Sequence, residues 1–340
     1  MQTMFHASIG GIRGYLPERV LTNEELSQEI GWTPADIARK TGIVSRRIAA
    51  ADECVSDMAT LAAKRLIIDL RLDPESLDFL ILCTQTPDHY LPTTACLVQC
   101  RLGLPSRCAS FDLNQGCSGY IYSLSVAAAY IRSGMFRQGI VLTADTYSKL
   151  IHPKDRSVRT LFGDAATATW IRRSDEPGLG RFVMGTDGSG AENLIVPAGG
   201  LRQRSSQKSS REFQDESGNT RSADHLSMNG PTLFEFALRR VPDLANRVLE
   251  SNDLGGDCQP HWYVFHQASG FMLEQLRSKM SIPREKVVYH LREVGNTVSS
   301  TIPLALREYE QLGRFSVGEK LLLLGFGVGY SWGGTILTWR

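Results

Sequence analysis

The chain has 340 residues, of which 42% are hydrophobic, so it can bury the core of one large domain or of two ordinary ones. Its 37 basic and 36 acidic residues leave a formal net charge of +1, which argues against nucleic acid as the main partner. The N-terminal residues do not resemble a signal peptide, and no stretch reaches the roughly 18 uninterrupted apolar residues of a membrane span. We therefore expect a cytoplasmic protein with neither nucleic-acid nor membrane partners.

The seven cysteines form an odd, irregular set, which suits a reducing compartment better than a disulfide framework. Cys96 and Cys100 could share a helix face as a metal pair, but no second pair or nearby His completes a zinc site. We expect no metal site, and we expect most of the cysteines to be small buried hydrophobic residues.

The first half of the chain alternates between strands and helices. Thr22 followed by Glu25 forms a capping box that opens a helix, and Thr33 precedes a proline at a second helix start. A long amphipathic helix is predicted to begin near Ser56 and to end near Asp69. Strands are predicted over residues 5–11, 78–84, 110–113, 139–144 and 165–171.

The second half repeats this α/β pattern, and a further helix is predicted after Pro231. Strands are predicted over residues 262–265, 320–324 and 335–339, and helices over residues 269–280 and 300–312. Residues 199–224 are polar, rich in serine and nearly free of aliphatic side chains. We expect this segment to be an exposed loop, either a lid or a mobile part of the surface.

Cys117 lies in the segment NQGCSG, between a short predicted strand and a helix predicted over residues 120–133. At a helix N-terminus the partial positive charge and the free backbone N–H groups favour a thiolate. The flanking Gly116 and Gly119 permit the close backbone approach that a nucleophile needs. The pattern predicts a reactive cysteine, although a buried structural cysteine would leave the same local sequence.

His266 ends a predicted apolar strand, where a neutral imidazole can donate to an oxyanion or move a proton. Asn296, in GNTVSS, offers an amide N–H donor that stays uncharged at any pH. The alternate glycines of GFGVG allow a backbone N–H to approach a reacting carbonyl. Each pattern alone is also typical of a structural residue or a turn, so the inference depends on their combination.

In their order along the chain, these segments resemble the ketoacyl-acyl-carrier-protein synthase III enzymes of the thiolase superfamily. The resemblance covers nearly the whole chain. It rests on YLPERVLTNEEL, KTGIVSRRIAA, LPTTAC, the Cys117 segment, Asp155-Arg156, FGDAA, His266-Gln267-Ala268, GNTVSSTIP and GFGVGYSWGG.

This resemblance implies an α/β fold, a thiolase-like five-layered αβαβα sandwich of two similar halves, which works as a homodimer without a cofactor. Residues 1–175 would carry Cys117, and residues 176–340 would carry His266 and Asn296. An acyl group would pass from acyl-CoA or an acyl-carrier protein to Cys117. Decarboxylation of a malonyl-carrier protein beside His266 and Asn296 would then give the enolate that attacks the acyl group.

The same resemblance assigns roles around these three residues. The N–H groups of Cys117 and of the Gly327-Val328 loop would bind the oxyanion, and Phe326 would lie beside the nucleophile. Leu91 would reach across the dimer to the acyl pocket of the partner. The path of the thioester donor would include Lys40, Arg156, Met228, Asn229, Gly230 and Ser269.

The chain departs from the family where the donor is held. Asp36 stands where the family often has a Trp that stacks on the adenine of coenzyme A. Ser269 and Phe271 stand where it has an Asn and a carrier-contacting Arg. We therefore expect a carrier-bound donor, in a relative from a specialised pathway rather than the housekeeping initiator of fatty acid synthesis. The cationic docking patch for the acidic carrier would comprise Arg277, Lys279 and Arg284.

Two alternatives remain open. An acyltransferase of the same fold could pass the acyl group to an alcohol or amine without decarboxylation, but such relatives often change the Asn that is present here at position 296. A non-catalytic partner subunit of a heterodimeric synthase usually lacks the nucleophile, whereas Cys117 is retained. Fold analogy alone does not decide between them.

Overall fold

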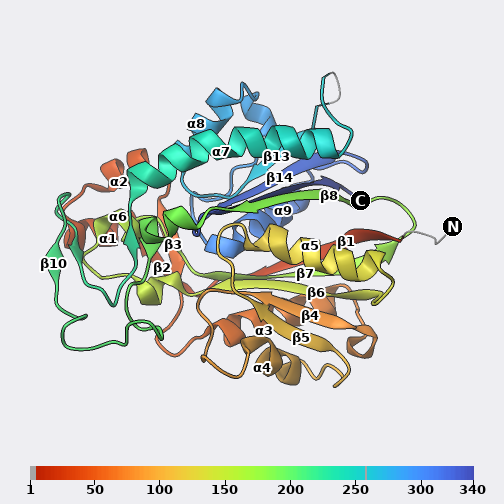
Figure 1. The fold of residues 1–340 in the computed structure, drawn as a ribbon, viewed down its shortest axis with the longest axis horizontal. Helices are drawn as coiled ribbons and strands as arrows, with labels where there is room; N and C mark the ends of the chain where they lie inside the picture. Colours follow the sequence, from red (N-terminus) through yellow and green to blue (C-terminus); the bar gives the residue numbers. More distant parts are fainter. Residues whose placement is uncertain (1–4, 257–258) are drawn as a thin grey trace.

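The structure, a computed structural model, describes residues 5–256 and 259–340. Two β-sheets lie face to face with helices between them, and further helices cover the outer face of each sheet (Figure 1). The predicted five-layered αβαβα sandwich is therefore confirmed. Cys258, one of the seven cysteines, lies outside the described residues.

The first sheet has five strands in the order β1-β7-β6-β4-β5. These are β1 (His6–Tyr15), β7 (Ala165–Ser174), β6 (Gln138–Asp145), β4 (Phe79–Cys83) and β5 (Ala109–Leu113). Strand β4 pairs in parallel with both β5 and β6, and all five of its residues are buried, as its continuous apolar sequence predicts. On the outer face of this sheet lie α3 (Val55–Asp69) and α4 (Thr94–Arg101).

The second sheet has four strands, all from residues 179–338. In spatial order they are β13 (Trp262–Phe265), β14 (Lys320–Gly327), β15 (Ser331–Thr338) and β8 (Leu179–Thr186). Strands β13 and β14 are parallel, so both end at the same edge of the sheet. The outer layer consists of α7 (Gly230–Ser251), which packs along the sheet, and α8 (Gly270–Lys279), which packs beside α7.

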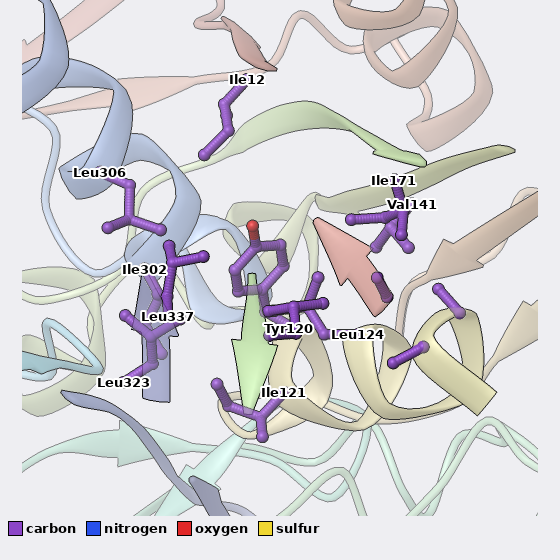
Figure 2. Packing of buried hydrophobic residues seen from close by; sticks show 14 of the residues in the cluster. Ile12, Tyr120, Ile121, Leu124, Val141, Ile171, Ile302, Leu306, Leu323 and Leu337 are labelled. Atoms are coloured by element: carbon purple, nitrogen blue, oxygen red, sulfur yellow. The ribbon is translucent and has the colours of Figure 1, made fainter. Parts of the chain in front are cut away.

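The middle layer consists of α5 (Gly119–Arg132) and α9 (Thr301–Gln311). Side chains from both helices and both sheets form one buried apolar cluster (Figure 2). Burying a large apolar side chain typically contributes about 1.5–3 kcal/mol, so this cluster holds the two sheets together. Its labelled members are Ile12, Tyr120, Ile121, Leu124, Val141, Ile171, Ile302, Leu306, Leu323 and Leu337.

Shorter elements gather at the end of the sandwich away from the two termini (Figure 1). They include α1 (Asn23–Ile30), α2 (Pro34–Thr41), α6 (Arg156–Arg159), β2 (Arg19–Thr22), β3 (Ser45–Ile48) and β10 (Phe213–Gln214). The remaining short elements are β9 (Leu194–Ile195), β11 (Thr220–Arg221), β12 (Ser227–Met228), η1 (Pro74–Ser76), η2 (Tyr147–Leu150), η3 (Gly188–Asn193), η4 (Arg284–Lys286) and η5 (Val298–Ser300). Within the described ranges, no helix has both the length and the apolar character needed to cross a membrane.

The predicted helix starts agree with the structure. The Thr22 hydroxyl accepts the N–H of Glu25 at 3.2 Å, and the Thr33 hydroxyl accepts the N–H of Asp36 at 3.1 Å. Strand β8 was not predicted, because its sequence LGRFVMGT contains two glycines and no continuous apolar run. Strand β15 begins at Ser331, before the predicted start at residue 335.

Most of the polar segment 199–224 is exposed, as predicted, but part of it has regular structure. It forms a hairpin of β10 and β11 and buries small polar side chains. The Arg221 guanidinium donates to the fully buried carboxylate of Asp155 at 2.9 Å and contacts Asp215 at 3.1 Å. The hairpin is thus anchored by charge-assisted hydrogen bonds rather than by apolar contacts, which the hydropathy pattern could not show.

Candidate active site

A cavity of about 390 Å³ brings together the three predicted catalytic residues Cys117, His266 and Asn296. Its walls are mostly apolar, and the few polar groups come from loops next to the sheets. Residues of α7 and α8 line its outer part. The predicted residues Phe326, Gly327, Met228, Gly230 and Ser269 also line this cavity.

Cys117 lies in the turn between β5 and α5 and is only 4% exposed. The β14–β15 turn packs closely against it: a Cβ added to Gly327 would lie 2.6 Å from the Cβ of Cys117 and 2.8 Å from its sulfur. A glycine is therefore required at position 327. The backbone N–H groups of Val328 and of Cys117 itself both favour the thiolate form of this sulfur.

The electrostatics of Cys117 differ from the sequence-based expectation. Burial raises the pKa of its thiol to about 12, and the charge of Asp145 adds to the rise. The backbone N–H of Val328 opposes it. The expectation of a lowered pKa is thus wrong, because desolvation outweighs the local effect of the helix N-terminus. The thiol is the resting form at neutral pH.

His266 follows β13, and its backbone N–H donates to the carbonyl of Leu324 at 2.8 Å. Burial lowers the pKa of the imidazole to about 3, so the ring is neutral at physiological pH. Its Nδ1 lies 2.7 Å from the hydroxyl of Thr301, at the start of α9. The ring of Phe326 packs against it at 87°, with 5.7 Å between centroids. These contacts fix the orientation of the imidazole ring. Its Nε2 is the ring nitrogen without a hydrogen-bond partner among the described residues.

Asn296 is held by its backbone and its side chain. Its N–H donates to the carbonyl of Leu161 at 2.9 Å, and its carbonyl accepts the N–H of Gly163 at 3.0 Å. Its Oδ1 accepts the N–H of Val298 at 3.0 Å, so the amide NH₂ is the group that remains for a ligand. Val298 has a φ of 54°, which is rare for a β-branched residue and indicates backbone strain beside the site.

The predicted donor-path residues separate into two groups. Met228 and Gly230 line the cavity, whereas Asn229 caps α7 by accepting the N–H of Thr232 at 3.3 Å. Ser269 does both: it lines the cavity and accepts the N–H of Met272 at 3.1 Å as the cap of α8. Capping accounts for the side-chain oxygens of Asn229 and Ser269 without any substrate.

Lys40 and Arg156 lie outside the cavity lining, on a surface that includes Trp32, a residue that the sequence analysis did not select. The Lys40 ammonium lies 4.0 Å and the Arg156 guanidinium 5.6 Å from the centroid of the Trp32 ring. Arg156 also donates to the carbonyl of Ser217 in the polar hairpin at 2.5 Å. Asp36 points elsewhere, because it is ion-paired with Arg39 at 2.9 Å. Only the fold reveals that Trp32 lies beside both cations.

The predicted docking patch is partly occupied by internal contacts. Arg277 pairs with Glu274 at 2.5 Å, and the Arg284 guanidinium lies 6.0 Å from the Tyr289 ring centroid. Lys279 is exposed and forms no ion pair with any described residue. Leu91 is 83% exposed and lies outside the cavity of its own chain.

Comparisons with known proteins agree on one family. The family model described as 3-oxoacyl-[acyl-carrier-protein] synthase III matches residues 111–188, and the model of its C-terminal part matches residues 257–339. The β-ketoacyl-[acyl-carrier-protein] synthase III of Neisseria gonorrhoeae is 35% identical over 334 residues, 98% of this chain and 99% of that protein.

Solved structures agree as well. A crystal structure of a 3-oxoacyl-(acyl-carrier-protein) synthase III has a TM-score of 0.96 at 47% identity, covering 98% of this chain and 100% of that one. A second, from Burkholderia xenovorans LB400, has a TM-score of 0.89 at 34% identity, covering 98% and 94%. The chain therefore belongs to the β-ketoacyl-acyl-carrier-protein synthase III family, the acyltransferase-type condensing enzymes of the thiolase superfamily.

Proposed function

We propose that this condensing enzyme loads an acyl group on Cys117 and then joins it to the enolate of a malonyl-carrier protein. In the first step the Cys117 sulfur bonds to the acyl carbon, and the donor leaves as a thiol that takes up the cysteine proton. In the second step the malonyl group loses carbon dioxide and its carbanion attacks the acyl carbon. The bond between the acyl carbon and the sulfur breaks, the Cys117 thiolate takes up a proton from water, and a β-ketoacyl thioester leaves.

The observation that carries this proposal is the placement of one nucleophile and two uncharged hydrogen-bond donors around a single apolar cavity. Decarboxylation creates an enolate oxygen, and neutral N–H donors stabilise that charge without a proton transfer. Asn296 offers its amide NH₂, and His266 is neutral because burial lowers its pKa to about 3. For His266 to donate from Nε2, the Thr301 hydroxyl must give its one proton to Nδ1 at 2.7 Å rather than to the carbonyl of Val298 at 3.1 Å.

The donor of the acyl group is the second part of the proposal. The expectation of a carrier-bound donor rested on Asp36 standing where the family has an adenine-stacking Trp. Trp32 now provides an aromatic face with Lys40 and Arg156 beside it, a combination that suits an adenine ring and nearby phosphates. We therefore infer that acyl-CoA is the first donor, and we keep a carrier protein as the bearer of the malonyl group.

We further propose that the chain is a homodimer. Strand β5 is an edge strand of the first sheet and pairs only with β4 among the described strands. Each of its five residues is half-buried, and Phe111 is one of its apolar members. An unpaired apolar edge is a template for a second chain, and pairing there would extend the sheet across the dimer. The exposed Leu91 then becomes available to the pocket of the partner.

The first prediction concerns the acylated residue. Incubation of the chain with acyl-CoA should add the acyl mass, and Cys117→Ser and Cys117→Ala should both abolish that increment. Intact-mass and peptide mass spectrometry measure it, with the exposed Cys96→Ser and Cys100→Ser variants as controls that should acylate normally. An acyl group found on another cysteine would contradict the assignment.

The second prediction separates the two half-reactions. His266→Ala or Asn296→Ala removes one donor from the enolate site, which should slow condensation by about a hundredfold or more. Acylation of Cys117 should persist in both variants, because the Val328 N–H group is unaffected. Carbon dioxide release from a malonyl thioester and acyl-enzyme mass provide the two readouts. Equal loss of both half-reactions would instead make His266 the base that activates Cys117.

The third prediction concerns the donor. Trp32→Ala should raise the KM for acyl-CoA about tenfold or more, whereas Trp32→Phe should retain much of the aromatic contact. Acylation from an acyl-carrier protein should change little in either variant. Unchanged acyl-CoA kinetics in Trp32→Ala would rule out this donor site.

For the carrier substrate, Lys279→Glu should weaken binding more than Arg277→Glu, since Arg277 is already paired with Glu274.

The fourth prediction concerns assembly. Light scattering should give about twice the chain mass of 37.6 kDa. Phe111→Asp should favour the monomer, because it places a charge beside the proposed strand pairing. Leu312→Asp, at an exposed apolar position that is 58% accessible, is the matched control and should stay dimeric. A monomeric wild-type chain would exclude the dimer.

A further inference from the structure

Asp145 is a buried carboxylate next to the site to which the proposed reaction gives no role. It ends β6 and has no exposed surface. Its Oδ1 accepts the N–H of Gln85 at 2.9 Å, and its Oδ2 accepts the hydroxyl of Ser299 at 2.5 Å and the N–H of Ser299 at 3.4 Å. No described cation pairs with it. A buried charge without a cation is costly, so its presence beside an active site calls for a functional explanation.

One partner of this carboxylate lies against the nucleophile loop. Gln85 follows β4, and a Cβ added to Gly116 would be 2.4 Å from the Oε1 of Gln85. The Gln85 amide is itself held by the hydroxyl of Tyr147 at 2.5 Å. The hydrogen bond from the Gln85 N–H to Asp145 therefore fixes Gln85, whose side chain packs against Gly116, the residue before Cys117.

The other partner lies in the segment that carries Asn296 and contacts His266 through Thr301. Ser299 is in η5, three residues after Asn296 and two residues before Thr301, which contacts His266. The residue before it, Val298, has the strained φ of 54°. A strained turn persists only where its surroundings hold it, and the two bonds from Ser299 to Asp145 supply such a hold.

The charge of Asp145 also acts on the nucleophile. Burial raises the pKa of Asp145 to about 7, so charged and neutral forms coexist near neutral pH. The charged form raises the pKa of the Cys117 thiol, because a nearby anion disfavours a thiolate. The other titratable groups that interact with Asp145 are Cys83, Tyr147 and Asp164, and none of them supplies a positive charge.

We propose that Asp145 is a positioning residue that connects the Cys117 loop to the segment that carries Asn296 and, through Thr301, contacts His266. The carboxylate is hydrogen-bonded to Gln85 and to Ser299, so a displacement of one of these residues changes the position of the other. Its effect on condensation rests on the roles proposed above for Cys117, His266 and Asn296, whereas the packing of the Cys117 loop against Gln85 does not.

Asp145→Asn in the full-length chain tests both parts. The substitution weakens the hydrogen bonds that hold Gln85 against the Cys117 loop, so the rate of Cys117 alkylation by iodoacetamide should change by about three- to tenfold near pH 8. The amide cannot accept from all three donors, so condensation by the acylated enzyme should fall by about tenfold or more. Peptide mass spectrometry follows the alkylation of Cys117 itself and needs no substrate. It therefore measures the effect of Asp145 on the Cys117 loop even if the proposed function is wrong.

Asp78→Asn is the control. Asp78 also accepts two backbone N–H groups, from Arg137 at 2.7 Å and from Gln138 at 3.1 Å, but it lies at the opposite end of β6 from Asp145. Its variant should leave the alkylation profile of Cys117 and the condensation rate within about twofold of the wild type. An equal change in the alkylation rate of both variants, or no change in Asp145→Asn, would overturn the proposal.

Ser299→Ala keeps the test decisive if Asp145→Asn does not fold. It removes the hydroxyl that holds the strained turn and leaves the carboxylate in place. Condensation should again fall by about tenfold, while acylation of Cys117 continues. A Ser299→Ala enzyme with the condensation rate of the wild type would refute the positioning role.

Discussion

The packing of α5 and α9 between the two sheets is the interaction on which the site depends. Both helices are buried in one apolar cluster, so their positions relative to the sheets are fixed by side-chain packing. Helix α5 begins just after Cys117, and α9 begins at Thr301, just after the Asn296 segment. Strands β5 and β13 lead into Cys117 and His266. The same packing therefore brings together residues that lie far apart in the chain.

One physical cause, removal from water, explains the protonation states in the site. Burial raises the pKa of Cys117 to about 12 and of Asp145 to about 7, and lowers that of His266 to about 3. Each shift favours the neutral form of its group. A neutral imidazole suits hydrogen bonding to an enolate, but a neutral thiol is a poor nucleophile. The backbone N–H groups of Val328 and Cys117 are the contacts that favour the thiolate against this desolvation.

The sequence was sufficient to predict site residues that local patterns mark, and insufficient to predict those whose roles depend on long-range contacts. Cys117 could be predicted from its place between a strand and a helix, and the resemblance added the fold and the roles of His266 and Asn296. Trp32 and Asp145 could not be predicted, because their neighbours come from distant segments and no spacing identifies them. The thiolate expectation failed for the same reason: a helix N-terminus is visible in sequence, whereas desolvation depends on the whole fold.

Asn296 shows why long-range bonds are needed here. His266 directly follows β13, and Cys117 lies in the short turn between β5 and α5, so regular secondary structure holds both residues. Asn296 instead lies in a turn between Gly295 and η5, with strain at Val298. Its position must therefore come from bonds outside that turn: the bridge to residues 161–163 on one side, and the Ser299 contact with Asp145 on the other. The donor with the least support from its own secondary structure thus depends most on the rest of the fold.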